Sequence, residues 1–226
     1  MAPSTAAALD LPPAALGRRF LLDRVGSLIG IAPLGLWTTV HLWNNLAALD
    51  GAAAWSASVT HHENVTGGYA GFVALVAFLV WHTVWGLQRL LHASPNAAPH
   101  LGNVRYWLQR LAGIGLLLFL GAHLYLAKLD PLLHTGRPET FNDIAAHMAH
   151  HLPTLLVYLL GVLGIAFHLG NGLWSFSFSF GLVSSQRGLR TLTWLSGAFA
   201  LFLLAVGWVA VYALWHAGQP LPTPLD

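Results

Sequence analysis

The chain has 226 residues, of which 56% are hydrophobic and only 8% are charged. Soluble domains carry about 25% charged residues, so this chain has too few polar side chains to cover a surface that faces water. The composition therefore predicts a membrane protein in a lipid bilayer. The chain has no cysteine, which excludes disulfides, thiolate metal sites and a cysteine nucleophile. Its formal charge of +2 is too small to indicate nucleic-acid binding.

Apolar segments of membrane-spanning length follow one another along the chain. Each is close to the ~20 residues that a helix needs to cross a bilayer, and short polar connections separate them. No shift in composition indicates a second domain, so we expect one all-α transmembrane domain over residues 18–217, with short tails at 1–17 and 218–226. The five expected helices are Val25–Leu49, Gly68–Leu91, Tyr106–Lys128, Pro153–Phe178 and Leu192–His216.

Basic residues beside the helix ends predict the orientation, because cytoplasmic connections are enriched in Lys and Arg. One side of the expected bundle has only Lys128 and Arg137, whereas the other side has eight basic residues. This distribution places the N-terminus in the cytoplasm and the C-terminus outside, in a bacterial cytoplasmic membrane. The eight basic residues of the other side are Arg18, Arg19, Arg24, Arg89, Arg105, Arg110, Arg187 and Arg190.

The longest connection, residues 129–152, contains a segment with the pattern of a short interfacial helix at residues 139–151. Its histidines, His147, His150 and His151, are candidate metal ligands. No carboxylate or cysteine completes a recognisable metal-binding pattern with them. We interpret them as histidines of the surface or the membrane interface.

One histidine lies well inside each of the first four apolar segments: His41, His82, His123 and His168. An ionisable side chain inside a bilayer is costly unless it has a partner. A hydrogen bond between helices would account for one such residue, but here four successive helices each bury a histidine, and each burial is unfavourable without a partner. We therefore interpret all four as ligands of buried cofactors.

The depths of these histidines sort them into two pairs. With a rise of about 1.5 Å per residue, His41 and His123 lie roughly 20–24 Å from the inner edge of the bilayer. His82 lies only roughly 10 Å from that edge, and His168 is also in the inner half. The sequence thus predicts an outer pair, His41 with His123, and an inner pair, His82 with His168, separated by roughly 10–15 Å.

Two histidine pairs at two depths match bis-histidine ligation of two haem b groups, each held between two helices. Neutral imidazole is the ligating form, so burial favours it. Arg24, Arg89 and Arg110 at the inner edge are candidates to pair with haem propionates, although a role in topology explains them equally well. Glycines near the ligands would leave room for porphyrin, and membrane helices also use glycine for packing. These glycines are Gly86, Gly115, Gly121, Gly161, Gly164 and Gly172.

Three motifs resemble a known family, the dihaem cytochrome b membrane-anchor subunits of succinate dehydrogenases and fumarate reductases. The motifs are LIGIAPLGL at 28–36 with HLWN at 41–44, WLQRLAG at 107–113 with His123, and HLGNGLWSF at 168–176. The resemblance is to the branch with five helices in one anchor subunit, and the last motif is the most specific.

The resemblance implies that His41 and His123 bind the outer haem and that His82 and His168 bind the inner one, in agreement with the depths. It also implies two cytoplasmic partners, a flavoprotein with FAD and an iron–sulfur protein. Electrons would enter at the inner haem and reduce a quinone, expected to be menaquinone, near the outer face. The dicarboxylate chemistry would lie on the flavoprotein, so this chain would hold no catalytic residue of its own. The complex could form a higher oligomer.

Two positions bear on proton uptake and transfer. Glu63, in the expected outer connection after His41, matches the offset of a quinone-associated glutamate in some relatives, and an outer carboxylate can exchange protons with a quinone. A solvated loop acid is the other interpretation. Some dihaem relatives have a glutamate two residues before the fourth ligand, where this chain has Ala166. A transmembrane proton route through that group is therefore not expected, and quinone reduction would consume outer protons.

Two other functions compete with this one. The first is the cytochrome b subunit of a hydrogenase or formate dehydrogenase, but those proteins tend to distribute their ligands differently among the helices. The second is a non-redox anchor in which the histidines only pack helices together. Within the resembling family, the direction could be succinate oxidation or fumarate reduction.

Overall fold

The computed structural model describes residues 13–65, 68–92, 101–137 and 139–220, with backbone alone at 13–16, 18–19, 60–65, 68–69 and 101–102. Within these ranges every regular element is a helix. The helices include five spans long and apolar enough to cross a membrane, which confirms the expected fold class. These spans are Phe20–Asp50, Ala70–Leu91, Asn103–Thr135, Leu152–Ser179 and Gln186–Ala217.

The first span is a composite helix that starts earlier than the expected Val25. It consists of α1 (Pro13–Ile29), a π-helical turn η2 (Gly30–Gly35), α2 (Leu36–Asn45) and a 3-10 turn η3 (Leu46–Asp50). Pro33 lies inside the π-helical turn. Because proline has no backbone N–H to donate, it interrupts regular α-helical hydrogen bonding at this point.

The second and third spans follow the expected helices closely. Helix α4 (Gly68–Leu91) has the expected limits. Helix α5 (Leu101–Leu124) continues through a π-helical turn η4 (Tyr125–Leu129) into α6 (Asp130–Thr135), beyond the expected end at Lys128. The helix ends at Gly136, whose φ of 68° is the left-handed conformation that glycine adopts readily at a helix C-terminus.

The connection between the first two spans is a helix, α3 (Ala52–Val65), and not the short polar loop that we expected. The segment begins with three alanines, which favour helix strongly, and it has no internal glycine or proline. Its Trp55 is 9% exposed and packs at a ring distance of 5.7 Å against Phe141. Tertiary packing therefore keeps this segment helical despite its polar second half.

The expected short helix of the long connection is present as α7 (Phe141–His150). Thr140 and Asp143 form a capping box at its N-terminus, in which each side chain bonds the other's backbone N–H. The buried side chains of α7 are Phe141, Ala145 and Met148, and the helix packs against α8 and α9. Helix α7 therefore contributes to the buried core of the bundle.

Helices α8 (Leu152–Ser179) and α9 (Gln186–Ala217) form the best-buried pair of the bundle. Small residues allow their close approach, since a Cβ on Gly207 would lie 2.5 Å from a methyl group of Val162. Helix α9 starts before the expected Leu192 because Ser185 caps it, accepting a hydrogen bond from the Gly188 N–H at 3.0 Å.

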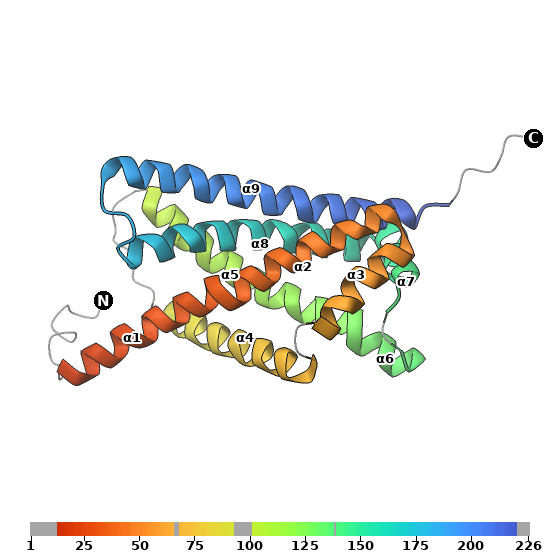
Figure 1. The fold of residues 1–226 in the computed structure, drawn as a ribbon, viewed down its shortest axis with the longest axis horizontal. Coiled ribbons are helices and arrows are strands. Elements are labelled where there is room, and N and C mark those ends of the chain that lie inside the picture. The colour runs from red at the N-terminus through yellow and green to blue at the C-terminus, as the bar shows by residue number, and fades with distance from the viewer. Residues whose placement is uncertain (1–12, 66–67, 93–100, 138, 221–226) are drawn as a thin grey trace, which may run out of the picture.

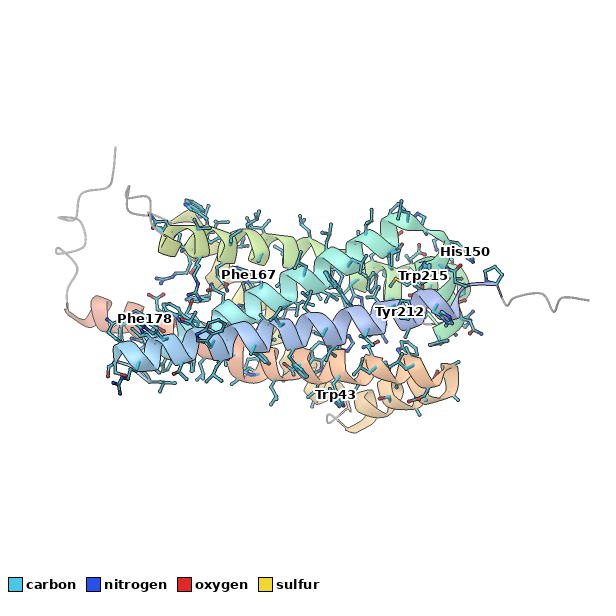
Figure 2. All side chains as sticks on the ribbon, turned by 90° about the horizontal axis from the view of Figure 1, so that it is seen from above. Trp43, His150, Phe167, Phe178, Tyr212 and Trp215 are labelled. Atoms are coloured by element: carbon cyan, nitrogen blue, oxygen red, sulfur yellow. The ribbon has the colours of Figure 1, made fainter. Side chains whose placement is uncertain are left out.

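Helix α1 begins at one end of an elongated bundle and α9 ends at the other (Figure 1). Helices α3, α6 and α7 gather at the end where α9 ends, which we call the distal end, and the α8–α9 turn lies at the other, proximal end. Figure 2 shows Tyr212 and Trp215 near the distal end and Phe178 near the proximal end. Large apolar side chains face outward between them, including Leu201 at 67% exposure, as expected for a surface that contacts lipid.

Candidate functional site: two histidine pairs

The structure brings the four membrane histidines together in the two pairs expected from their depths. His82 of α4 and His168 of α8 form the inner pair, with ring centroids 6.3 Å apart and ring planes at 87°. His41 of α2 and His123 of α5 form the outer pair, with centroids 6.2 Å apart and planes at 69°. Each pair therefore joins two helices that are distant in sequence.

The spacing within both pairs fits coordination of one metal ion between the rings. An imidazole nitrogen binds a transition-metal ion at about 2.0 Å, and the ring centre lies roughly 1.1 Å behind that nitrogen, so two imidazoles on opposite sides of one ion have centroids about 6.2 Å apart. The distances of 6.2 and 6.3 Å agree with this value.

Hydrogen bonds occupy Nδ1 of the two inner histidines. The Nδ1 of His82 lies 3.0 Å from the carbonyl oxygen of Gly26, and that of His168 lies 3.2 Å from the carbonyl oxygen of Gln109. An Nδ1–H that donates to a carbonyl leaves the Nε2 lone pair available for a metal. The Gly26 carbonyl thus favours the tautomer of His82 that a ligand needs, whereas the Nδ1 of His168 lies equally close, at 3.2 Å, to the Gln109 carbonyl oxygen and to the Gln109 Nε2.

A polar network that sequence reasoning missed surrounds His168. The Gln109 Nε2 donates to the His168 carbonyl oxygen at 3.1 Å, and the Asn171 Nδ2 donates to the Gln109 Oε1 at 2.8 Å. The Asn171 Oδ1 accepts from Arg105 Nη2 at 2.8 Å and from Nε at 3.0 Å. The signal in the sequence was the i, i+4 spacing of Arg105 and Gln109 at the start of an apolar helix, which places both on one face.

A cavity of about 460 Å³ lies beside the inner pair, between η2, α4, α5 and α8. Its volume is within the range of cofactor and ligand sites. Both inner histidines line it, together with Tyr106 and Arg110. Gly30 lets His82 approach its helix, since a Cβ there would lie 2.5 Å from the His82 Cε1 atom.

The glycines around the histidines divide into three groups. Gly86 and Gly172 line the inner cavity, as expected if they leave room for a cofactor. Gly161 is instead covered by the ring of Phe119, and Gly164 faces Leu116, so these two glycines serve the packing of α8 against α5. A Cβ on Gly115 or Gly121 would meet open space.

The three candidate arginines differ in their partners. Among the side chains that the structure describes, Arg24 and Arg110 each have a buried guanidinium nitrogen without a hydrogen-bond acceptor, Nη1 and Nε respectively. Buried donors are nearly always paired in folded proteins, so both nitrogens fit an anionic group such as a propionate. Arg110 lines the inner cavity, whereas Arg24 is not among the lining residues and lies over the rings of Phe20 and Phe180. Arg89 lines the cavity but already forms an ion pair with Asp23 at 2.9 Å.

Aromatic rings hold the outer pair. Trp37 stacks on His41 with centroids 4.8 Å apart and planes at 8°, and Phe119 stacks on His123 at 5.7 Å and 19°. The His123 Nδ1 lies 3.0 Å from the Tyr158 hydroxyl oxygen, so this histidine also has Nδ1 occupied. Ring packing thus contributes to the position of both outer histidines, and the Tyr158 hydroxyl also contacts His123.

Glu63 lies in α3, and its side chain falls outside the described residues, so its quinone role stays a prediction. The histidines of the long connection have separate neighbours, with the His147 Nδ1 2.7 Å from Glu139 and the His151 Nδ1 2.8 Å from the Thr154 hydroxyl. Among the described residues, no group of three or more His, Asp and Glu side chains is arranged to hold a metal ion.

Comparison with known proteins gives the family of the chain. Residues 92–207 match the family model described as the succinate dehydrogenase/fumarate reductase transmembrane subunit. The chain is also 30% identical to the succinate dehydrogenase cytochrome b558 subunit of Bacillus subtilis (strain 168) over 199 residues, which cover 87% of this chain and 97% of that relative. The chain belongs to this family.

Membership in the succinate dehydrogenase/fumarate reductase transmembrane subunits confirms the resemblance drawn from the three sequence motifs. The chain is a membrane-anchor subunit of the cytochrome b type, and its five apolar helices agree with a multi-pass protein of the bacterial cytoplasmic membrane. Of the alternatives raised by the sequence, family membership favours the succinate dehydrogenase/fumarate reductase function over a hydrogenase or formate dehydrogenase subunit.

Proposed function

We propose that this chain is the membrane-anchor and electron-transfer subunit of a succinate:quinone oxidoreductase. The observation that carries the proposal is the pair of histidine pairs, His82 with His168 and His41 with His123, each at the spacing for one metal ion. Together they supply four imidazoles from four helices, which is the number that two bis-histidine haem b groups need.

The residues present fit haem in three independent ways. The inner cavity of about 460 Å³ adjoins the candidate ligands His82 and His168. The Nδ1 hydrogen bond of His82 leaves its Nε2 available for iron. The buried nitrogens of Arg24 and Arg110 have no hydrogen-bond acceptor and could each bind an anion. Haem bound at each pair supplies a one-electron redox centre. Asn171 and Gln109 fix the inner ligand, and Trp37 and Phe119 fix the outer pair.

The family supports the proposed partners. We propose that a flavoprotein with FAD and an iron–sulfur protein dock at the proximal end, where basic residues flank the helices and α1 begins. The distal end would face outward, and menaquinone would be reduced there. Residues 18–217 would act as one transmembrane domain, with tails on either side. The same complex working as a fumarate reductase is the alternative direction.

A haem count tests this proposal directly. The complex purified in detergent should contain two haems b per chain by the pyridine-haemochrome assay, together with a co-purifying flavoprotein and iron–sulfur protein. A preparation that assembles with its partners and holds no haem would contradict the proposal. Comparing succinate oxidation with fumarate reduction in the same preparation then separates the two directions.

A further inference from the structure

A buried carboxylate lies at the distal end, away from the four histidines. The side chain of Glu139 is only 3% exposed, and its Oε1 lies 2.7 Å from Nδ1 of His147, whose own side chain is 51% exposed. The histidine therefore connects a group in the interior with the water outside. A carboxylate is rarely buried to this extent without a partner, and His147 is that partner.

The other side of Glu139 faces the helix that supports the outer pair. Glu139 and Tyr158 of α8 line the same narrow crevice, together with Thr154 and Met148. The Tyr158 hydroxyl lies 3.0 Å from Nδ1 of His123. His147 thus joins outer water to Glu139, and Glu139 lines the same crevice as Tyr158, which contacts a histidine of the outer pair.

The charges around Glu139 make its protonation sensitive to the surroundings. Burial raises the pKa of the Glu139 carboxyl, the hydrogen bond and charge of His147 oppose that shift, and the nearby Asp143 and Asp130 raise the pKa further. Arg137 compensates much of the Asp143 charge, because the two form an ion pair at 2.7 Å. A negative charge added nearby would favour the protonated form of Glu139.

We propose that Glu139 is a proton-uptake site that binds a proton when an electron reaches the outer histidine pair, with His147 as the relay from outer water. This inference rests on the proposed function, because it needs a redox centre between His41 and His123. Nothing in it requires Glu63.

The proton balance is one proton per electron. An O–H bond forms on the Glu139 carboxylate, the N–H bond of protonated His147 breaks, and His147 takes a new proton from water. Succinate supplies the electrons through the partner subunits, and reduction of a quinone to a quinol consumes two electrons and two protons. The crevice has no room for a water molecule, so the transfer is between side chains, and a quinone ring binds elsewhere.

The test is a redox titration of the haems in the purified complex at several pH values. In the wild type, the midpoint potential of the outer haem should fall as pH rises, by at most about 59 mV for each tenfold drop in proton concentration. Glu139→Gln should remove most of this dependence. Asp130→Asn, which changes a neighbouring acid, is the matched control and should keep the slope but move it to lower pH, because the Asp130 charge raises the pKa of Glu139.

A second readout separates uptake from relay. Reduction of the wild type should produce the infrared band of a protonated carboxyl group, and Glu139→Gln should lack it. His147→Gln should keep the band but slow proton uptake, followed with a pH-indicator dye, at least tenfold. A wild-type outer-haem potential that does not vary with pH would overturn the inference alone, whereas the absence of haem from the outer pair would overturn the proposed function.

Discussion

Asn171 donates a hydrogen bond from Nδ2 to Oε1 of Gln109 over 2.8 Å, and this bond aligns the side chain that supports His168. The same Asn171 accepts two bonds from Arg105, whose guanidinium lies 4.4 Å from the ring centre of Trp174. Residues of the HLGNGLW motif thus fix α5 against α8 at the depth of the inner pair. This gives the asparagine of the motif a physical role.

Replacing Asn171 with Ala should loosen the inner ligand. Partners that orient a metal-binding histidine typically change metal affinity about 10- to 100-fold when they are removed. We therefore expect Asn171→Ala to lower inner-haem retention during purification by a similar factor, measured from the haem-to-protein ratio and the low-spin EPR signals.

Asn45→Ala provides the matched control for this prediction. Asn45 donates to the His41 carbonyl oxygen at 2.8 Å and accepts from Trp55 at 3.0 Å, so its loss should affect the outer haem and spare the inner one. Equal effects of the two substitutions on both haems would argue against a role of Asn171 at the inner pair.

Replacing the ligands themselves should separate the two electron-transfer steps. His168→Ala should remove or weaken the inner haem and block the entry of electrons from the partner subunits. His41→Ala should keep electron entry, observed as rapid reduction of the inner haem by succinate, but disable quinone reduction. Normal bis-histidine spectra for both haems in His168→Ala would refute the assignment.

Much of the site could be predicted from sequence because membrane helices obey simple geometry. Apolar segments of bilayer length fix the number of spans, and a constant rise per residue fixes the depth of each histidine. The pairing of His41 with His123 and of His82 with His168 follows from depth alone, and the structure has both pairs. Similarly, the sequence pattern of the Glu139–His151 segment predicted the short helix that the structure has as α7.

The rest depended on how the helices rotate and pack. Gln109 meets Asn171 only because α5 and α8 turn those faces toward each other, and no spacing along the sequence encodes that contact. Gly161 was expected to make room for porphyrin, but Phe119 of another helix covers it. Likewise, Trp55 of α3 packs against Phe141, a residue distant in sequence, and we had expected the α3 segment to be a loop.

Filling the inner cavity should prevent haem binding. Gly86 lines the cavity, and a Cβ at that position would meet open space, so Gly86→Leu should fold while projecting its side chain into the cofactor volume. We expect loss of the inner haem with normal membrane insertion. Gly115→Leu is the control, since a Cβ there also meets open space but Gly115 does not line this cavity. Unchanged haem content in Gly86→Leu would mean that the cavity is not the haem site.

The arginines should differ in their effect on the inner haem. Arg24→Gln and Arg110→Gln each remove a positive charge whose buried nitrogen has no hydrogen-bond acceptor. Because a nearby positive charge favours the reduced haem over the more positive oxidised haem, each substitution should lower the midpoint potential of the inner haem by tens of millivolts. A shift of ~59 mV corresponds to a tenfold change in the equilibrium constant. Arg89→Gln should have a smaller effect because Asp23 already compensates its charge. A redox titration at constant pH compares the three, and the largest shift in Arg89→Gln would contradict the assignment.

The cap of α7 should depend on pH through Asp143. The Arg137 guanidinium and the Thr140 N–H and hydroxyl hold the pKa of the Asp143 carboxyl well below its ordinary value of 3.8. Because the folded state binds this proton less readily than the unfolded state, the contribution of Asp143 to stability is fully present above pH 3.8. It is lost as pH falls through the lower pKa of the folded state.

Asp143→Asn should therefore destabilise α7 by about 1 kcal/mol at neutral pH, the usual cost of losing an N-cap interaction. Hydrogen exchange of the α7 amides in the detergent-solubilised complex measures this difference, with the exposed Asn142→Ala as the control. A difference between wild type and Asp143→Asn that stays constant well below pH 3.8 would show that the carboxylate charge does not stabilise this helix.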